Sequence, residues 1–315
     1  MLYPDLFQRI LWFPVERFDR ARALEQAWER AWRRHMPDTD RFAEPFDRLW
    51  KERTLWTPAL FLNATWVETG KRLIASNLRL LPRNDQDSEN FVDVEDTHRF
   101  FGERALALST AVHLSARFTY VSPAGTLVRD GHVQGHAVDG GYFENSGATT
   151  THEILKAIDQ LTDTDPGWKR VHVVVIHISN EPVNPAHPDK MLAAGTGNPA
   201  TRPPPLLNET LSPLLAIINT RGARGEYARE ALRWHAGGSS FLHFGLCKRE
   251  EAVPLGWVLS EASQEMMEQQ LTKEKCLATN EPDRVLINNP KNLCEIRNQV
   301  AARFAAPGAK PQTCN

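Results

Sequence analysis

The sequence of 315 residues predicts a single α/β domain over residues 1–305, followed by a disordered tail at 306–315. Segments with helical spacing of apolar residues alternate with runs of strand-forming residues over most of the length. The run "RVHVVVIHIS" at 170–179 is almost continuously apolar and β-branched, which is typical of a buried parallel strand. No internal repeat and no linker-like stretch divides the chain.

The first part of the chain, 1–56, is predicted to be mainly helical. In the segment 19–35, Leu24, Trp28 and Trp32 recur at four-residue spacing, with Arg and Glu on the other face. The stretch 43–53 is typical of a short second helix. Tryptophan is frequent here, and we expect most of these large rings to pack in a core.

Strands and turns dominate the middle of the chain. Two strand-forming runs flank the sequence Glu-Thr-Gly-Lys at 68–71, which predicts a hairpin. Two more short strands are predicted around Asp130-Gly131. Helical spacing returns at 100–116 and at 147–161.

The last part of the chain begins with a segment rich in Pro, Gly and Asn, which predicts a long irregular loop at 180–208. A long helix is expected from about 209 to 235, and the sequence "SSFLHFGL" predicts another strand. Amphipathic patterns predict two final helices, at 259–275 and 290–305.

The composition is that of an ordinary soluble globular protein, with 41% hydrophobic and 24% charged residues. The formal net charge of −2 gives no reason to expect a nucleic-acid partner. No apolar run approaches the ~20 residues needed to cross a bilayer, and the N-terminus lacks the pattern of a signal peptide. We therefore expect a cytoplasmic protein that needs no cofactor.

The cysteines are Cys247, Cys276, Cys294 and Cys314. None forms a C-x-x-C pair, so a structural zinc site is not expected. In a cytoplasmic protein the default is reduced thiols. A bridge between Cys276 and Cys294 stays open, because spacing alone does not settle it.

The stretch "GHVQGHAVDGGYFENSG" at 131–147 contains the candidate site. Asp139 could mark a simple turn, bind a metal with His132 and His136, or form the acidic half of a catalytic pair. The neighbouring glycines disfavour a helix, and on a strand the two histidines would lie about 13 Å apart, too far for one ion. The metal interpretation is therefore the weakest.

A carboxylate can act as general base for a serine hydroxyl if it is held within hydrogen-bond reach. Gly140 and Gly141 would let the chain turn sharply after Asp139 and would leave its carboxylate uncrowded. The turn and the catalytic interpretations are therefore compatible with each other.

Several segments, in order, resemble patatin-like phospholipases. They are "PALFLNATWVETGKRLIAS", "LSTAVHLSARFTYVSPAG", "HAVDGGYFENSG" and "PLGWVLSEAS". The helix and the β-branched strand that follow the third segment also stand in the family's order. The resemblance covers most of residues 1–275.

This resemblance implies a three-layer α/β sandwich with a mostly parallel central sheet. It implies a lipid acyl hydrolase in which a serine of a G-x-S-x-G turn attacks a lipid ester, at times at a membrane surface. Asp139 would be the general base, Gly140 and Gly141 would shape its turn, and Asn145 matches the family's asparagine after the motif.

The chain departs from the family pattern because no G-x-S-x-G occurs in its 315 residues. The "GGSS" at 237–240 opens a strand, and Ser115 lies in a helix rather than in a glycine turn. We therefore expect a domain that is incomplete at its N-terminal side, inactive alone and marginally stable. A missing N-terminal segment or a partner chain would carry the nucleophile.

The alternative is a relative without catalytic activity that binds a lipid or a protein. In that case the tryptophan-rich start of the chain and the loop at 180–205 would form the binding surface.

Overall fold

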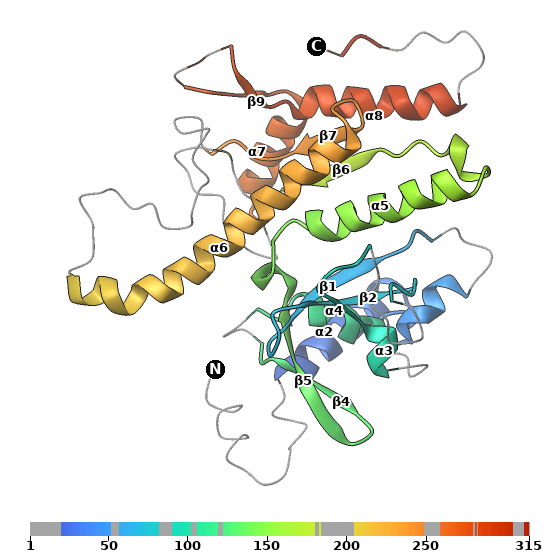
Figure 1. The fold of residues 1–315 in the computed structure, drawn as a ribbon, viewed down its shortest axis with the longest axis vertical. Coiled ribbons are helices and arrows are strands. Elements are labelled where there is room, and N and C mark those ends of the chain that lie inside the picture. Colours follow the sequence, from blue (N-terminus) through green and yellow to red (C-terminus); the bar gives the residue numbers. More distant parts are fainter. Residues whose placement is uncertain are drawn as a thin grey trace. The chain divides into compact units, whose positions relative to one another are not determined.

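A computed structural model gives the fold of the chain (Figure 1). It describes residues 20–51, 57–81, 90–101, 106–118, 122–179, 183, 205–248, 259–279, 281, 283–304 and 312–314. By its internal contacts the chain divides into unit 1, Met1–Glu153, and unit 2, Ile154–Asn315. The prediction of a single domain over 1–305 stays a prediction.

Unit 1 contains a five-stranded mixed sheet in the order β3-β2-β1-β5-β4. Only β2 and β3 run parallel, and the other three neighbouring pairs are antiparallel. The strands are β1 (Phe61–Trp66), β2 (Arg72–Ser76), β3 (Val94–Asp96), β4 (Gly125–Arg129) and β5 (His132–Asp139). The α/β class is confirmed.

The expectation of a mostly parallel sheet is wrong for unit 1, because two tight turns force antiparallel pairing. The predicted hairpin at 68–71 joins β1 to β2, with Gly70 at φ +70°. The predicted hairpin at Asp130-Gly131 joins β4 to β5, and both turn residues have positive φ, as a tight hairpin turn requires. Figure 1 shows β4 and β5 as one continuous hairpin.

The helices of unit 1 cover part of the sheet and leave much of β4 and the first half of β5 exposed. Helix α4 packs against β1, and α2 packs against α4. The helical elements are α2 (Arg20–His35), η2 (Phe46–Trp50), α3 (Thr97–Phe101), α4 (Leu108–Ser115) and η3 (Gly140–Tyr142). One core cluster joins Ala64, Trp66, Leu73, Leu114, Leu127 and Ala137. The single helix predicted at 100–116 is two described elements, α3 and α4, with 102–105 outside the described residues.

Unit 2 contains a parallel pair of strands, β6 and β7, joined through the long helix α6 (Figure 1). Its elements, with α5 beginning in unit 1, are α5 (Ala148–Thr164), η4 (Trp168–Arg170), β6 (Val175–Ile178), α6 (Pro205–Ala236), β7 (Phe241–Phe244), α7 (Glu261–Thr272), β8 (Cys276–Leu277), β9 (Val285–Ile287) and α8 (Asn289–Phe304). The parallel strand predicted within 170–179 is confirmed for Val175–Ile178, as β6, but the expectation that it is buried is wrong for one face, where Ile176 and Ile178 are exposed. No helix in the described ranges is long and apolar enough to cross a membrane.

The predicted irregular loop at 180–208 lies mostly outside the described residues. Val183 forms a bridge with Cys247, and α6 begins at Pro205, so the last four residues of the predicted loop are helical. The expected tail at 306–315 is described only at 312–314.

Two disulfides replace the expected reduced thiols. Cys247 is bonded to Cys276, and Cys294 is bonded to Cys314, with Cα atoms 5.4 and 5.6 Å apart. A Cys276–Cys294 bridge is excluded because β8 brings Cys276 beside the segment after β7, whereas Cys294 lies on α8.

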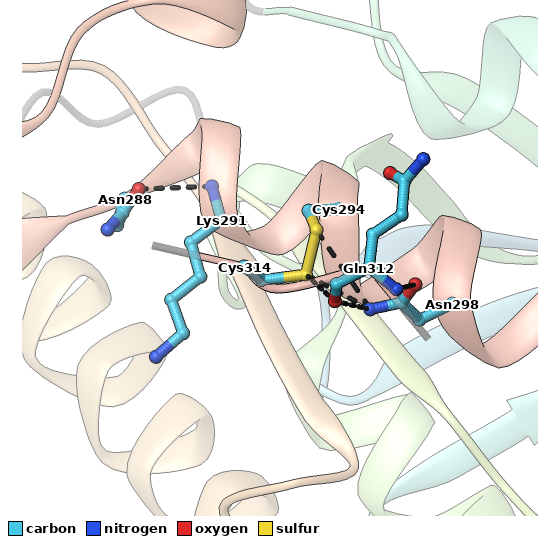
Figure 2. Close-up of a disulfide and its surroundings, with 6 residues drawn as sticks. All are labelled: Asn288, Lys291, Cys294, Asn298, Gln312 and Cys314. Carbon is cyan, nitrogen blue, oxygen red and sulfur yellow. Dashed lines mark hydrogen bonds between the residues drawn. A yellow bond between two sulfur atoms is a disulfide. The ribbon is translucent and has the colours of Figure 1, made fainter. Parts of the chain in front are cut away.

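The second disulfide holds the C-terminal end against α8 (Figure 2). Asn298 of α8 adds two hydrogen bonds to Gln312, donating from Nδ2 to its carbonyl oxygen at 2.7 Å and accepting its N–H at 2.8 Å. The described part of the tail, 312–314, is therefore fixed to the helix.

Candidate functional site

Asp139 is the last residue of β5, where it lies opposite Ala64 of β1. Its backbone N–H donates to the carbonyl oxygen of Arg117 at 3.0 Å, and its carbonyl oxygen accepts from Thr65 Oγ1 at 2.9 Å. Its carboxylate Oδ1 accepts the N–H of Gly141 at 2.7 Å. These bonds fix both the backbone and the side chain of Asp139 at the end of the strand.

Both glycines after Asp139 lie in close contacts, but only Gly140 is required by a contact with backbone. A Cβ on Gly140 would lie 2.2 Å from the carbonyl oxygen of Asn63 in β1. A Cβ on Gly141 would lie 2.9 Å from Asp139 Oδ1 and from Asn145 Oδ1. The structure therefore gathers the four residues that the sequence singled out, Asp139, Gly140, Gly141 and Asn145, around one turn.

His132 and His136 do not form a metal site with Asp139 in this structure. The backbone N–H of His136 donates to one carboxylate oxygen of Glu68 at 2.9 Å, and its Nδ1 lies 2.7 Å from the other. Burial opposes ionisation of Glu68, but these hydrogen bonds outweigh it and lower its pKa to about 2. Among the described residues no group of three or more His, Cys, Asp or Glu side chains could hold a metal ion.

Asn63 supports the Asp139 turn from behind. Its carbonyl oxygen, which touches Gly140, also accepts the hydroxyl of Ser115 at 2.7 Å. Its side-chain Oδ1 accepts from Thr150 Oγ1 of α5 at 2.9 Å. Ser115 thus lies beside the Asp-Gly-Gly turn, a proximity that the sequence did not reveal, and its hydroxyl proton is used in a backbone hydrogen bond.

A buried ion pair continues this network. Arg72 of β2 donates to Thr150 Oγ1 at 2.8 Å and to both carboxylate oxygens of Glu153 at 2.7 Å. Its guanidinium also lies 5.2 Å from the centre of the Phe143 ring. This buried ion pair, made by one terminal nitrogen of Arg72, fixes the start of α5 with respect to the sheet of unit 1.

Glu144 is a second carboxyl close to Asp139 in the chain, and it is buried. Burial raises its pKa, while hydrogen bonds from the Ser146 hydroxyl and the backbone of Thr149 and Gly147 offset part of the effect. Sequence reasoning missed both Glu144 and the Arg72–Glu153 pair. The sequence signal for the pair was Arg72 at the start of the apolar strand β2, because a buried arginine needs a partner of opposite charge.

A second constellation in unit 1 has the bonding pattern of a Ser-His-acid triad. His113 Nδ1 lies 3.0 Å from Glu25 Oε1, and its Nε2 lies 2.7 Å from Ser122 Oγ. Glu25 also accepts from Arg22 and Thr110. Burial works against ionisation of Glu25, but these bonds prevail and its pKa is lowered.

This constellation is a buried packing network rather than an accessible active site. Ser122 is 4% exposed and His113 is 0% exposed, so a substrate ester has no access to the hydroxyl. The ring of Trp28 in α2 closes over His113 in an edge-to-face contact at 5.4 Å. Trp28 thus packs against the interior, as expected for most of the N-terminal tryptophans.

Comparison with known proteins adds no relative: no family model matches the chain, and no curated protein matches it significantly. The patatin-like resemblance therefore rests on the sequence motifs.

Proposed function

We propose that unit 1 supplies the acidic half of a Ser-Asp lipid acyl hydrolase, with Asp139 as the general base. The observation that carries this proposal is the position of the carboxylate. It lies at a strand end, oriented by the N–H of Gly141, in a turn that leaves no room for a Cβ at Gly140. Asn145 belongs to the same turn and would help to keep Gly141 in place.

In the proposed reaction, Asp139 takes the proton of a serine hydroxyl as its oxygen attacks the ester carbonyl of a lipid. The alcohol of the ester leaves with that proton, and water then hydrolyses the acyl-serine. The serine and the oxyanion donors would come from a segment or a partner chain other than these 315 residues. Efficient acyl transfer needs all of these groups together, so the chain alone would be inactive.

The DNA upstream of Met1 provides the first test, because an in-frame G-x-S-x-G would supply the nucleophile. Expressed with such a segment, the chain should hydrolyse a lipid ester. Asp139→Asn should lower that rate at least about 100-fold. The matched control is Asp130→Asn, which changes an exposed aspartate at the other end of β5. Equal rates for Asp139→Asn and the unmodified protein would refute the proposal.

Covalent labelling of the chain alone distinguishes the proposed Asp139 site, which lacks its serine, from the set of Ser122, His113 and Glu25. A fluorophosphonate probe should leave residues 1–315 unlabelled. Labelling that disappears in Ser122→Ala would contradict the proposal and would assign the activity to Ser122, His113 and Glu25 instead.

A lipid- or protein-binding role without chemistry is the second candidate, and the surface of α6 favours it. Tyr227 and Trp234 are 78% and 77% exposed and lie two helical turns apart, on the side opposite the buried Leu232. Large exposed aromatic side chains are typical of binding surfaces. Co-flotation with liposomes that Trp234→Ala reduces, but Asp139→Asn leaves unchanged, would support this role over the hydrolase.

A further inference from the structure

Two histidines lie side by side on the parallel strands of unit 2, His177 buried and His243 partly buried. His177 of β6 and His243 of β7 are direct partners in the ladder, so both side chains project to the same face of the sheet. Their ring centres are 5.0 Å apart, and the ring of Phe241 stacks on His177 at 5.8 Å. His177 is 5% exposed. The two imidazoles therefore pack as apolar rings would.

The nitrogen atoms of these rings have little to bond to. Both ring nitrogens of His177 and Nε2 of His243 are buried, and none has a hydrogen-bond partner among the described residues. A neutral imidazole already leaves such groups unsatisfied, at a cost in stability. Protonation of His177 would put an N–H on both of its buried nitrogens and would add a positive charge, with no acceptor for either N–H among the described residues, which is far less favourable.

The groups around the pair do not offset a positive charge. Arg229 of α6 acts against protonation of both rings, and Glu226 of the same helix favours protonation of His177 only. Glu226 is itself ion-paired with Arg229. Helix α8 packs against β7 and its preceding turn with the uncharged amides of Asn292 and Gln299. Burial, then Arg229, lowers the pKa of His177 to about 4.

His243 is affected in the same direction. Burial, then the neighbouring His177 and Arg229, lowers its pKa to about 3. The two rings also couple to each other, because a proton on one disfavours a proton on the other.

We propose that the His177–His243 pair is an acid-sensitive latch, which holds β6 against β7 while both rings are neutral and releases the strands when either ring is protonated. The chain that connects the two strands includes α6. When β6 and β7 separate, this long connection is no longer held at both ends by the paired strands. The latch acts within unit 2 and does not depend on the function proposed for Asp139.

The latch is tested by hydrogen exchange of the full chain, measured by mass spectrometry on peptides that cover β6 and β7. In the unfolded chain each histidine regains its ordinary pKa of about 6.5, so unfolding takes up protons below that pH. Between pH 7 and pH 5 the opening equilibrium should rise roughly 20-fold for each histidine, after correction for intrinsic exchange rates. His177→Phe keeps an aromatic ring in place and should remove the share of His177, so that only the roughly 20-fold rise from His243 is left.

The matched control is His172→Phe, which changes an exposed histidine just before β6 and should leave the rise intact. A rise of the same size in His177→Phe and in the unmodified chain would overturn the proposal. If His177→Phe does not fold, the imidazole proton resonances of the unmodified chain decide. Titration of His177 and His243 near pH 6.5 in the folded chain would overturn the latch, and titration below pH 5 would support it.

Discussion

His113 in unit 1 and His177 in unit 2 are both buried, but the two units treat their ring nitrogens in opposite ways. His113 has Glu25 on one nitrogen and Ser122 on the other. His177 has no partner on either nitrogen among the described residues and is surrounded by aromatic rings. Burial alone therefore does not determine the behaviour of a histidine. The partners decide whether burial gives a fixed ionic network or a group that acid can disrupt.

Among the changes that test this comparison, removal of Glu25 should have the largest effect on the free energy of unfolding. Glu25→Ala would remove the carboxylate that His113, Arg22 and Arg117 share. Loss of one member of a buried ionic network destabilises a protein by about 3–5 kcal/mol. Urea unfolding at pH 7 would measure the change. Glu25→Gln, which keeps the shape, is the control and should cost less. A loss below about 1 kcal/mol in Glu25→Ala would show that the network does not stabilise unit 1.

Reduction of the disulfides should affect unit 2 alone, because all four cysteines lie between 247 and 314. Cys247–Cys276 and Cys294–Cys314 close loops with sequence separations of 29 and 20, and loops of this size contribute roughly 3 kcal/mol each. Dithiothreitol should lower the urea midpoint of unit 2 and leave that of unit 1 unchanged.

A thiol assay on protein purified without reductant checks the same bridges. It should find no free thiol. Four free thiols would contradict the pairing and would support the expected cytoplasmic location, since disulfides are typical of oxidising compartments.

The two units should lose stability in different pH ranges. The folded-state pKa of His177 lies below its unfolded value, so its stabilisation is present above pH 6.5 and is lost as the pH falls from 6.5 toward about 4. The pKa of Glu25 is also lowered, but from 4.5, so the Glu25 network is lost only below pH 4.5. At pH 5 unit 2 should be weaker by about 2 kcal/mol per buried histidine, with unit 1 unaffected. Exchange protection of β6 and of α4 should separate the two transitions, and a shared transition near pH 4 would contradict the assignment.

Ile178 should give the smallest effect on stability. It is the last residue of β6 and is 74% exposed, whereas its neighbour His177 points to the buried face. Ile178→Lys should change the free energy of unfolding by no more than about 0.5 kcal/mol and should slow aggregation, because charge on an exposed apolar strand opposes edge-to-edge pairing. Light scattering at equal concentrations measures the aggregation rate. A loss above 2 kcal/mol would show that Ile178 is covered in solution.

The local elements of the fold could be predicted from the sequence, because their signals lie within a few residues. The turn glycine Gly70 and the pair Asp130-Gly131 predict the hairpins, and apolar spacing predicts α2, α5, α6, α7 and α8. The arrangement of strands could not be predicted in this way. The pairing of β1 with β5 depends on contacts between residues far apart in sequence. The apolar run at 170–179 predicts a parallel strand, but the tight turns make most neighbouring strands of unit 1 antiparallel.

The candidate site was predictable only in part, for the same reason. Asp139, Gly140, Gly141 and Asn145 were found because they are neighbours in the chain. Arg72 and Glu153 are 81 positions apart, and His113 and Glu25 are 88 apart. No pattern of spacing links such residues, so only the folded chain reveals that they are partners. The disulfides were mispredicted because the pairing of four cysteines depends on where β8 and α8 lie.

The boundary between the two units falls inside α5, between Glu153 and Ile154, so one continuous helix belongs to both. Its first turns give Thr150 and Glu153 to Arg72 of unit 1, and its later part gives Asp159 to His235 of unit 2. The contacts that hold α5 therefore come from unit 1 in its first turns and from unit 2 in its later part. Exchange protection within this one helix should change at the boundary, with the turn around Thr150 and Glu153 opening when unit 1 opens and the turn around Asp159 opening when unit 2 opens.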